Sequence, residues 1–198
     1  GAADSWGKGL LGHGEGVTRL NTPTRLPSVE RAVSVSVGGG HCLAVTSSGA
    51  VWSWGQGGLG GLGHGDHQGQ WQPTKIAAFA GQSVVAVSAG VFHSFALTAD
   101  GSVWSWGAGG DGQLGHGDQQ CQLLPKQVEA LAGRRVVAVS AGDGGSAARR
   151  AGGEVSGGGE GGEGQLGHGD EQGQPLPKEV EAFAGQRGVA VSAGEQHS

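Results

Sequence analysis

A period of 52 residues constrains this chain more than any other feature of its sequence. The string LGHG occurs four times, with its histidines 51, 52 and 52 residues apart, at His13, His64, His116 and His168. A second string, V-S-[AV]-G, recurs at steps of 52 and ends at Gly38, Gly90, Gly142 and Gly194. Because two independent strings keep one period with almost no insertions, each unit is expected to be one structural module repeated in space.

The clearest unit predicts strands and turns throughout. Short β-rich runs lie at Val84–Val87, Phe92–Thr98 and Val103–Gly107, and Asp100-Gly101 between the last two is typical of a tight hairpin turn. After a glycine-rich loop and Pro125, the run Val128–Leu131 predicts a fourth, outer strand. Four short antiparallel strands per unit of about 50 residues indicate an all-β fold made of β-propeller blades.

The period divides the chain into one repeat domain, 1–198. The expected units are a partial repeat, two full repeats, a degenerate repeat and a second partial repeat, at 1–31, 32–83, 84–135, 136–187 and 188–198. Four units of this period would need about 208 residues and seven about 364. We therefore favour part of a longer propeller over a closed ring of four blades.

The degenerate repeat keeps its length but loses its large side chains. Aligned on the preceding repeat, it replaces Phe92, His93, Phe95, Leu97, Trp104 and Trp106 by Gly144, Gly145, Ala147, Arg149, Ser156 and Gly158. Each buried apolar group contributes roughly 1.5–3 kcal/mol, so losing several of them rivals the stability of a whole domain. The segment 143–163 is accordingly expected to be a poorly ordered blade with rapid amide exchange.

Composition excludes several functions. The formal charge is −5, with 12 basic and 17 acidic side chains, which gives no footprint for a direct contact with nucleic acid. No membrane span or signal peptide is recognisable, so we expect an intracellular protein, cytoplasmic or nuclear, with no membrane partner. Cys42 and Cys121 have no CxxC or Cys/His spacing around them, and neither a disulfide nor a zinc site is expected.

Motifs that suggest ligands have simpler structural interpretations. Three GxGxxG strings, at 55–60, 107–112 and 159–164, are followed by a turn instead of the helix that a dinucleotide needs. The histidines recur once per unit, in LGHG and at His41, His93 and His197, which favours hydrogen bonds within each blade over a metal site. No catalytic triad or spaced carboxylate pair is identified, and we expect no cofactor, no metal and no catalytic residue.

The strings VSAGVFHSFALTADGSVWSWGAGGDGQLGHGD and VSVGGGHCLAVTSSGAVWSWGQGGLGGLGHGD resemble repeats of the regulator-of-chromosome-condensation family. This resemblance covers nearly the whole chain and implies blades of a seven-bladed propeller. It also implies one of several functions: nucleotide exchange on a small GTPase, ultraviolet-B perception, or partner binding in large ubiquitin ligases. The photoreceptor branch has G-W-R-H-T where this chain has neither Trp nor Arg, for example at Val91-Phe92, so light perception by that mechanism is not expected.

Function is therefore expected to be a non-catalytic protein–protein interaction module. The alternatives are a guanine-nucleotide exchange factor for a small GTPase, and the substrate-binding propeller of a larger ubiquitin ligase. The long loops after the W-G strands are the candidate partner-binding surface, with Asp66, His67, Asp118 and Gln119 as their distinctive side chains. Structural roles are expected for the repeated His13, His64, His116, His168, His41, His93, Trp54 and Trp106. The sequence fixes neither the partner nor the oligomeric state.

Overall fold

The computed structural model describes residues 2–186 and 188–194, and its strands form four antiparallel sheets. The first sheet has two strands, β1 (Asp4–Lys8) and β2 (Arg19–Arg25). The second has β3 (Ala32–Val37), β4 (His41–Thr46), β5 (Val51–Gly55) and β6 (Gln70–Lys75). The third has β7 (Val84–Ala89), β8 (His93–Thr98), β9 (Val103–Gly107) and β10 (Gln122–Gln127). The fourth has β11 (Val136–Ala141), β12 (Gly145–Arg150), β13 (Val155–Gly159) and β14 (Gln174–Glu179).

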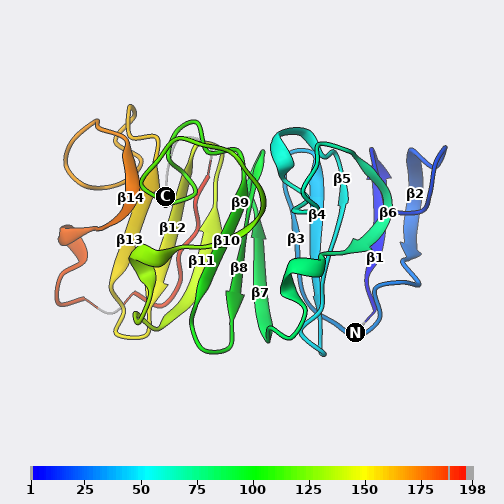
Figure 1. The fold of residues 1–198 in the computed structure, drawn as a ribbon, viewed down its shortest axis with the longest axis horizontal. Helices are drawn as coiled ribbons and strands as arrows, with labels where there is room; N and C mark the ends of the chain where they lie inside the picture. Colours follow the sequence, from blue (N-terminus) through cyan, green and yellow to red (C-terminus); the bar gives the residue numbers. More distant parts are fainter. Residues whose placement is uncertain (1, 187, 195–198) are drawn as a thin grey trace.

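The sheets are the expected propeller blades. Strands are hydrogen-bonded in sequence order within each sheet, and the sheets stand side by side along the molecule (Figure 1). We call β1–β2 the half-blade and the four-stranded sheets blades 1, 2 and 3, in chain order. The all-β fold with four antiparallel strands per blade is confirmed. The helices of the described residues are four 3-10 turns, none of which could cross a membrane.

The fourth strand lies earlier in the repeat than the sequence indicated. In blade 2 it is β10, and Val128–Leu131 instead leads into the 3-10 turn η3 (Glu129–Leu131). Val128 and Leu131 are both buried, because the turn places residues three apart on the same side and directs both into the core. Pro125 is accommodated within β10, where the register with β9 is irregular and a missing ladder donor costs little.

Hydrogen bonds between blades join the innermost strands. The amide of Ala89 donates to Ser36 Oγ of blade 1 at 2.9 Å, and Ala141 donates to Ser88 Oγ of blade 2 at 3.0 Å. The amide of Ala193 donates in the same way to Ser140 Oγ, so the segment after blade 3 continues the pattern. The serine of V-S-[AV]-G is therefore one of the residues that link each blade to the next.

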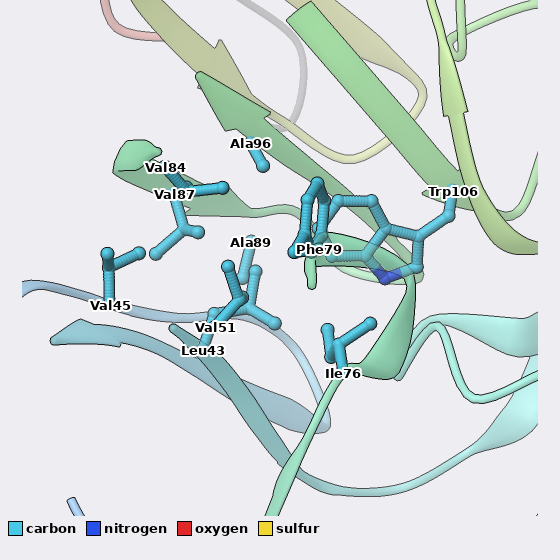
Figure 2. Packing of buried hydrophobic residues seen from close by; sticks show 10 residues of the cluster. All are labelled: Leu43, Val45, Val51, Ile76, Phe79, Val84, Val87, Ala89, Ala96 and Trp106. Carbon is cyan, nitrogen blue, oxygen red and sulfur yellow. The ribbon is translucent and has the colours of Figure 1, made fainter. Parts of the chain in front are cut away.

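The hydrophobic core is divided among the interfaces between blades. Figure 2 shows the cluster between blades 1 and 2, in which Phe79 and Trp106 pack with their ring centroids 5.6 Å apart. Phe79 belongs to the 3-10 turn η2 (Ala77–Phe79) that follows β6, whereas Trp106 comes from β9 of the next blade. A second cluster, which includes Phe95, Val128 and Ala148, fills the interface between blades 2 and 3.

Blade 3 forms the same sheet as the other blades, so the poor order expected for 143–163 does not extend to its strand pairing, and the rapid amide exchange expected there stays a prediction. β12 and β13 pair in continuous register from Gly145↔Gly159 to Arg149↔Val155. Backbone ladder bonds do not require particular side chains, so the strands persist without the lost aromatic residues. The loss appears in the packing, since a cavity of about 20 Å³ lies between blades 2 and 3 and is lined in part by Phe95, Ala147 and Gly158.

Candidate functional site

The longest loops and the turns of the first hairpins lie at one end of the blades. In a four-stranded antiparallel sheet the first and third connections lie at the same end of the strands. We define the loop face as these connections, at the top of Figure 1: 9–18, 38–40, 56–69, 90–92, 108–121, 142–144 and 160–173. All candidate partner-binding residues belong to this face.

Serine–histidine pairs hold the long loops in place. Ser53 Oγ donates to the carbonyl of Leu62 at 2.8 Å and lies 2.9 Å from His64 Nε2. Ser105 makes the equivalent contacts with Leu114 and His116, at 2.7 and 3.0 Å. In the half-blade, Ser5 contacts the Leu11 carbonyl and His13 in the same way.

These pairs have the spacing of a nucleophile and a base, but the geometry favours a structural role. Ser53 and Ser105 are fully buried, and each hydroxyl proton is directed to a backbone carbonyl instead of the imidazole. Burial lowers the pKa of His64, while the nearby Asp66 opposes this shift. Imidazoles that donate to the serine oxygens account for the repeated pairs.

Blade 3 lacks the serine of this arrangement. Gly157 occupies the position of Ser105, and both ring nitrogens of His168 are buried without a hydrogen-bond partner among the described residues. A Cβ added to Gly157 would lie 3.3 Å from the Leu166 carbonyl oxygen and 3.8 Å from His168 Nε2. The backbone of Gly157 is not in the left-handed region, so a serine side chain can be added there without backbone strain.

Gly157→Ser is therefore expected to stabilise the protein by about 1 kcal/mol, because it satisfies a buried imidazole and replaces a flexible glycine. Urea unfolding followed by circular dichroism measures the change. Gly162→Ser is the control, since nothing lies within 4 Å of its Cβ position. Destabilisation by Gly157→Ser, or an equal effect of both changes, would contradict this role of the serine.

The structure separates the four candidate partner-binding side chains into two kinds. Asp66 Oδ1 accepts a hydrogen bond from the amide of Gln68 at 2.9 Å, and Asp118 Oδ1 accepts one from the amide of Gln120 at 3.1 Å. These carboxylates therefore shape the loops. His67 and Gln119 are exposed and have no such bond among those found in the described residues, so they are the freer of the four.

The histidines of the G-x-x-H positions act between blades. His41 Nε2 lies 2.8 Å from Ser94 Oγ of blade 2, which differs from the expected bond within its own blade. Ser94 Oγ donates to the Gly61 carbonyl, which also accepts the indole N–H of Trp106. His93 is fully buried, and neither ring nitrogen has a partner among the described residues. His197 lies outside the described residues.

Burial controls the protonation of both histidines. It lowers the pKa of His41 to about 4, and burial together with the neighbouring His41 lowers the pKa of His93 to about 3. Both rings are therefore neutral near pH 7. Burial also raises the pKa of the Cys42 thiol to about 11, which makes this thiol a poor nucleophile. Cys42 and Cys121 are free, and the described ranges contain no cluster of three or more potential metal ligands.

The serine–histidine contacts recur at a fixed spacing, as expected for a repeat protein, and comparison with known families identifies the repeat. The profile of the Regulator of chromosome condensation (RCC1) repeat matches residues 5–45, 48–97, 100–149 and 152–198. The chain belongs to the RCC1 repeat family. A second RCC1 repeat profile matches 32–60 and 84–113, within blades 1 and 2.

RCC1 repeats similar to these occur in proteins with different functions. The chain is 40% identical over 196 residues to the E3 ubiquitin-protein ligase HERC2 of Homo sapiens, covering 96% of this chain and 4% of HERC2. It is 37% identical over 199 residues to the ultraviolet-B receptor UVR8 of Arabidopsis thaliana, covering 98% of this chain and 45% of UVR8. The chain thus spans less than half the length of either relative.

The RCC1 propeller is also seen in solved structures. Prp20p of Saccharomyces cerevisiae superposes with a TM-score of 0.84 at 22% identity, over 99% of this chain and 50% of Prp20p. Human WBSCR16 superposes with a TM-score of 0.74 at 26% identity, over 87% of this chain and 44% of that protein. The likeness to Prp20p shows the fold alone, and blades 1 to 3 follow the arrangement of an RCC1 propeller.

Sequence analysis missed the serines that partner the histidines. Ser53 and Ser105 lie at a spacing of 52 within the repeated string W-S-W-G, so the period offered the signal. Ser94 follows the histidine of G-x-x-H, but its partner His41 belongs to the previous blade. Only the arrangement of the blades in space reveals that contact.

Proposed function

We propose that this chain is a non-catalytic protein-binding module that contacts its partner through the loop face. The observation that carries this proposal is the contrast within that face. Buried strand residues beneath the face, such as Ser53 and Ser105, fix the loops, while side chains such as His67 and Gln119 remain exposed on them. Rigid strands that present exposed loops are a common basis for protein recognition.

Comparison with relatives supports binding over one fixed chemistry. HERC2 and UVR8 are named as a ubiquitin ligase and a light receptor, yet both contain repeats similar to this chain. Fold does not determine function, so the shared repeat fits a partner-binding role better than either activity. The identity of 40% to HERC2 favours the substrate-binding propeller of a larger ubiquitin ligase as the specific form of this function. Nucleotide exchange on a small GTPase is the other candidate function. It predicts that this chain accelerates the release of labelled GDP from a GTPase.

Photo-crosslinking tests the proposed surface. A photoreactive amino acid is placed at His67 or Gln119 on the loop face, and at Ala99 in the hairpin of the opposite end as the matched control. We expect the two loop-face positions to form the same discrete adduct in cell extract, with competition by unlabelled protein, and Ala99 to form none. Adducts at Ala99 alone, or none at any position, would contradict a binding role for the loop face.

A further inference from the structure

One interface on the loop face carries an apolar notch. Between blades 1 and 2 a cavity of about 80 Å³ opens beside Leu59, Val91 and Phe92, with His41 and Gln56 on its polar side. We call this cavity the interblade notch. Because one water needs roughly 10–15 Å³ of such space, the notch has room for one branched aliphatic side chain.

The apolar wall of the notch is exposed, although burial would be favourable. Leu59 has an exposed fraction of 44% and Phe92 one of 49%. Leu59 also has φ 57° and ψ 12°, a left-handed conformation that costs a branched side chain roughly 1 kcal/mol or more. The loop therefore holds an aliphatic side chain at the surface in a strained conformation, which is a pattern found at binding sites.

The sequence of the first loop explains this conformation. In blade 2 the corresponding residue, Asp111, has its amide bonded to Gln113 Oε1 at 3.0 Å, and Glu163 of blade 3 bonds Gln165 in the same way. Blade 1 has Gly61 where the other blades have glutamine, so this bond is absent there, and Leu59 differs from Asp111 and Glu163 in its left-handed conformation.

The next interface along the loop face replaces the apolar wall by carboxylates. Gly144 stands where Phe92 stood, and a Cβ built on it would lie 2.7 Å from Glu160 Oε2 and 3.5 Å from Asp111 Oδ2. Neither carboxylate takes part in an ion pair within the described residues. An apolar notch and a pair of carboxylates thus occupy equivalent places at neighbouring interfaces.

Charge on the whole loop face indicates which partner fits. Its connections contain no Lys or Arg and nine acidic residues: Glu15, Asp66, Asp111, Asp118, Asp143, Glu160, Glu163, Asp170 and Glu171. The described connections at the opposite end have mixed charge, with Glu30, Asp100, Glu129, Glu154 and Glu181 against Arg31, Arg134 and Arg135. Lys8 and Arg19 flank the connection 9–18, and Lys178 of β14 pairs with Asp170 at 3.8 Å. The rest of the face is acidic, and an acidic surface attracts a ligand of the opposite sign.

We propose that the interblade notch binds one aliphatic side chain of a basic polypeptide segment, and that Lys or Arg residues of the same segment lie over Asp111 and Glu160. This inference rests on the proposed function, because it assigns the partner chemistry of the same loop face. The apolar side chain fixes the position of the segment, and the acidic face selects its charge.

Four synthetic fluorescent peptides test the inference by anisotropy with the full chain. The first has a central leucine flanked by Lys and Arg; the second replaces leucine by serine; the third and fourth replace the basic residues by Gln or Glu. We expect the first to bind about tenfold more tightly than the second or third, the fourth not to bind, and the affinity of the first to fall as salt is raised.

Variants of the chain identify the site. Leu59→Gly is expected to abolish the preference for leucine over serine without lowering the melting temperature, because glycine relieves the left-handed strain. The pair Asp111→Asn and Glu160→Gln is expected to abolish the preference for the basic peptide over the Gln peptide. Phe183→Ser, which removes an exposed aromatic ring at the opposite end, is the control and should change neither preference.

The inference is overturned by equal binding of the leucine and serine peptides, by an unchanged preference for leucine in Leu59→Gly, or by an unchanged preference for the basic peptide in the Asp111→Asn and Glu160→Gln pair. If no peptide binds while His67 and Gln119 still crosslink a partner, the assignment of the notch is wrong and the proposed function stands. If crosslinking at those positions also fails, both are wrong.

Discussion

Trp106→Ala is expected to lower the free energy of unfolding by about 3–5 kcal/mol, the usual cost of truncating a buried tryptophan. The ring is fully buried between blades 1 and 2, packs against Phe79, and donates its indole N–H to the Gly61 carbonyl at 2.8 Å. Since a domain is typically stable by about 5–15 kcal/mol, this single change removes a large part of the total.

The comparison for this change is Trp6→Ala in the half-blade. Trp6 has an exposed fraction of 61%, so its truncation should cost about 0.5 kcal/mol or less. Urea unfolding followed by circular dichroism measures both variants. A loss below about 1 kcal/mol for Trp106→Ala would mean that the interfaces between blades contribute less than the packing indicates.

Acidification is expected to destabilise the protein through His41 and His93. Burial lowers their pKa values to about 4 and about 3 in the folded chain, from 6.5 when unfolded. Below pH 6.5 the unfolded chain therefore binds more protons than the folded chain. The stability that the two histidines contribute is complete above that pH. It is lost as the pH falls toward their pKa values in the folded chain. Between about pH 7.5 and 5.5 each histidine should cost about 1 kcal/mol.

His93→Leu isolates one of these contributions. Leucine cannot take up a proton and leaves no buried nitrogen without a partner, so the variant should be at least as stable as the natural chain near pH 7.5. It should lose about 1 kcal/mol less than the natural chain when the pH is lowered to about 5.5. An identical pH dependence in His93→Leu and the natural chain would show that His93 is not held neutral by burial.

Most of the fold could be predicted because the strands and turns of each blade follow from short-range sequence patterns. Alternating strands, the Asp100-Gly101 turn and the period of 52 residues indicate three of the four strands of blade 2 within a few residues. The fourth was misplaced because Val128 and Leu131 are apolar, as in a strand, but occupy a 3-10 turn. The order of blade 3 was underestimated, since side-chain loss weakens packing without removing the ladder.

The candidate site was predictable only in outline. Loops after the W-G strands were identified as the exposed surface, but the notch depends on residues from two blades, Leu59 and Phe92. Leu59, in the apolar wall of the notch, has a left-handed conformation that sequence patterns do not predict. The segregation of acidic residues to one face likewise becomes visible only when alternate connections are placed at one end of the sheets.

The central claim is that the loop face is the protein-binding surface. It is tested most directly by amide hydrogen exchange of this chain, measured with and without the partner that photo-crosslinking identifies. We predict that protection on binding falls in the connections of the loop face, including 56–69 and 108–121, with no change in the hairpins of the opposite end at 47–50 and 99–102. Protection confined to those hairpins, with unchanged exchange in the loops, would contradict the claim.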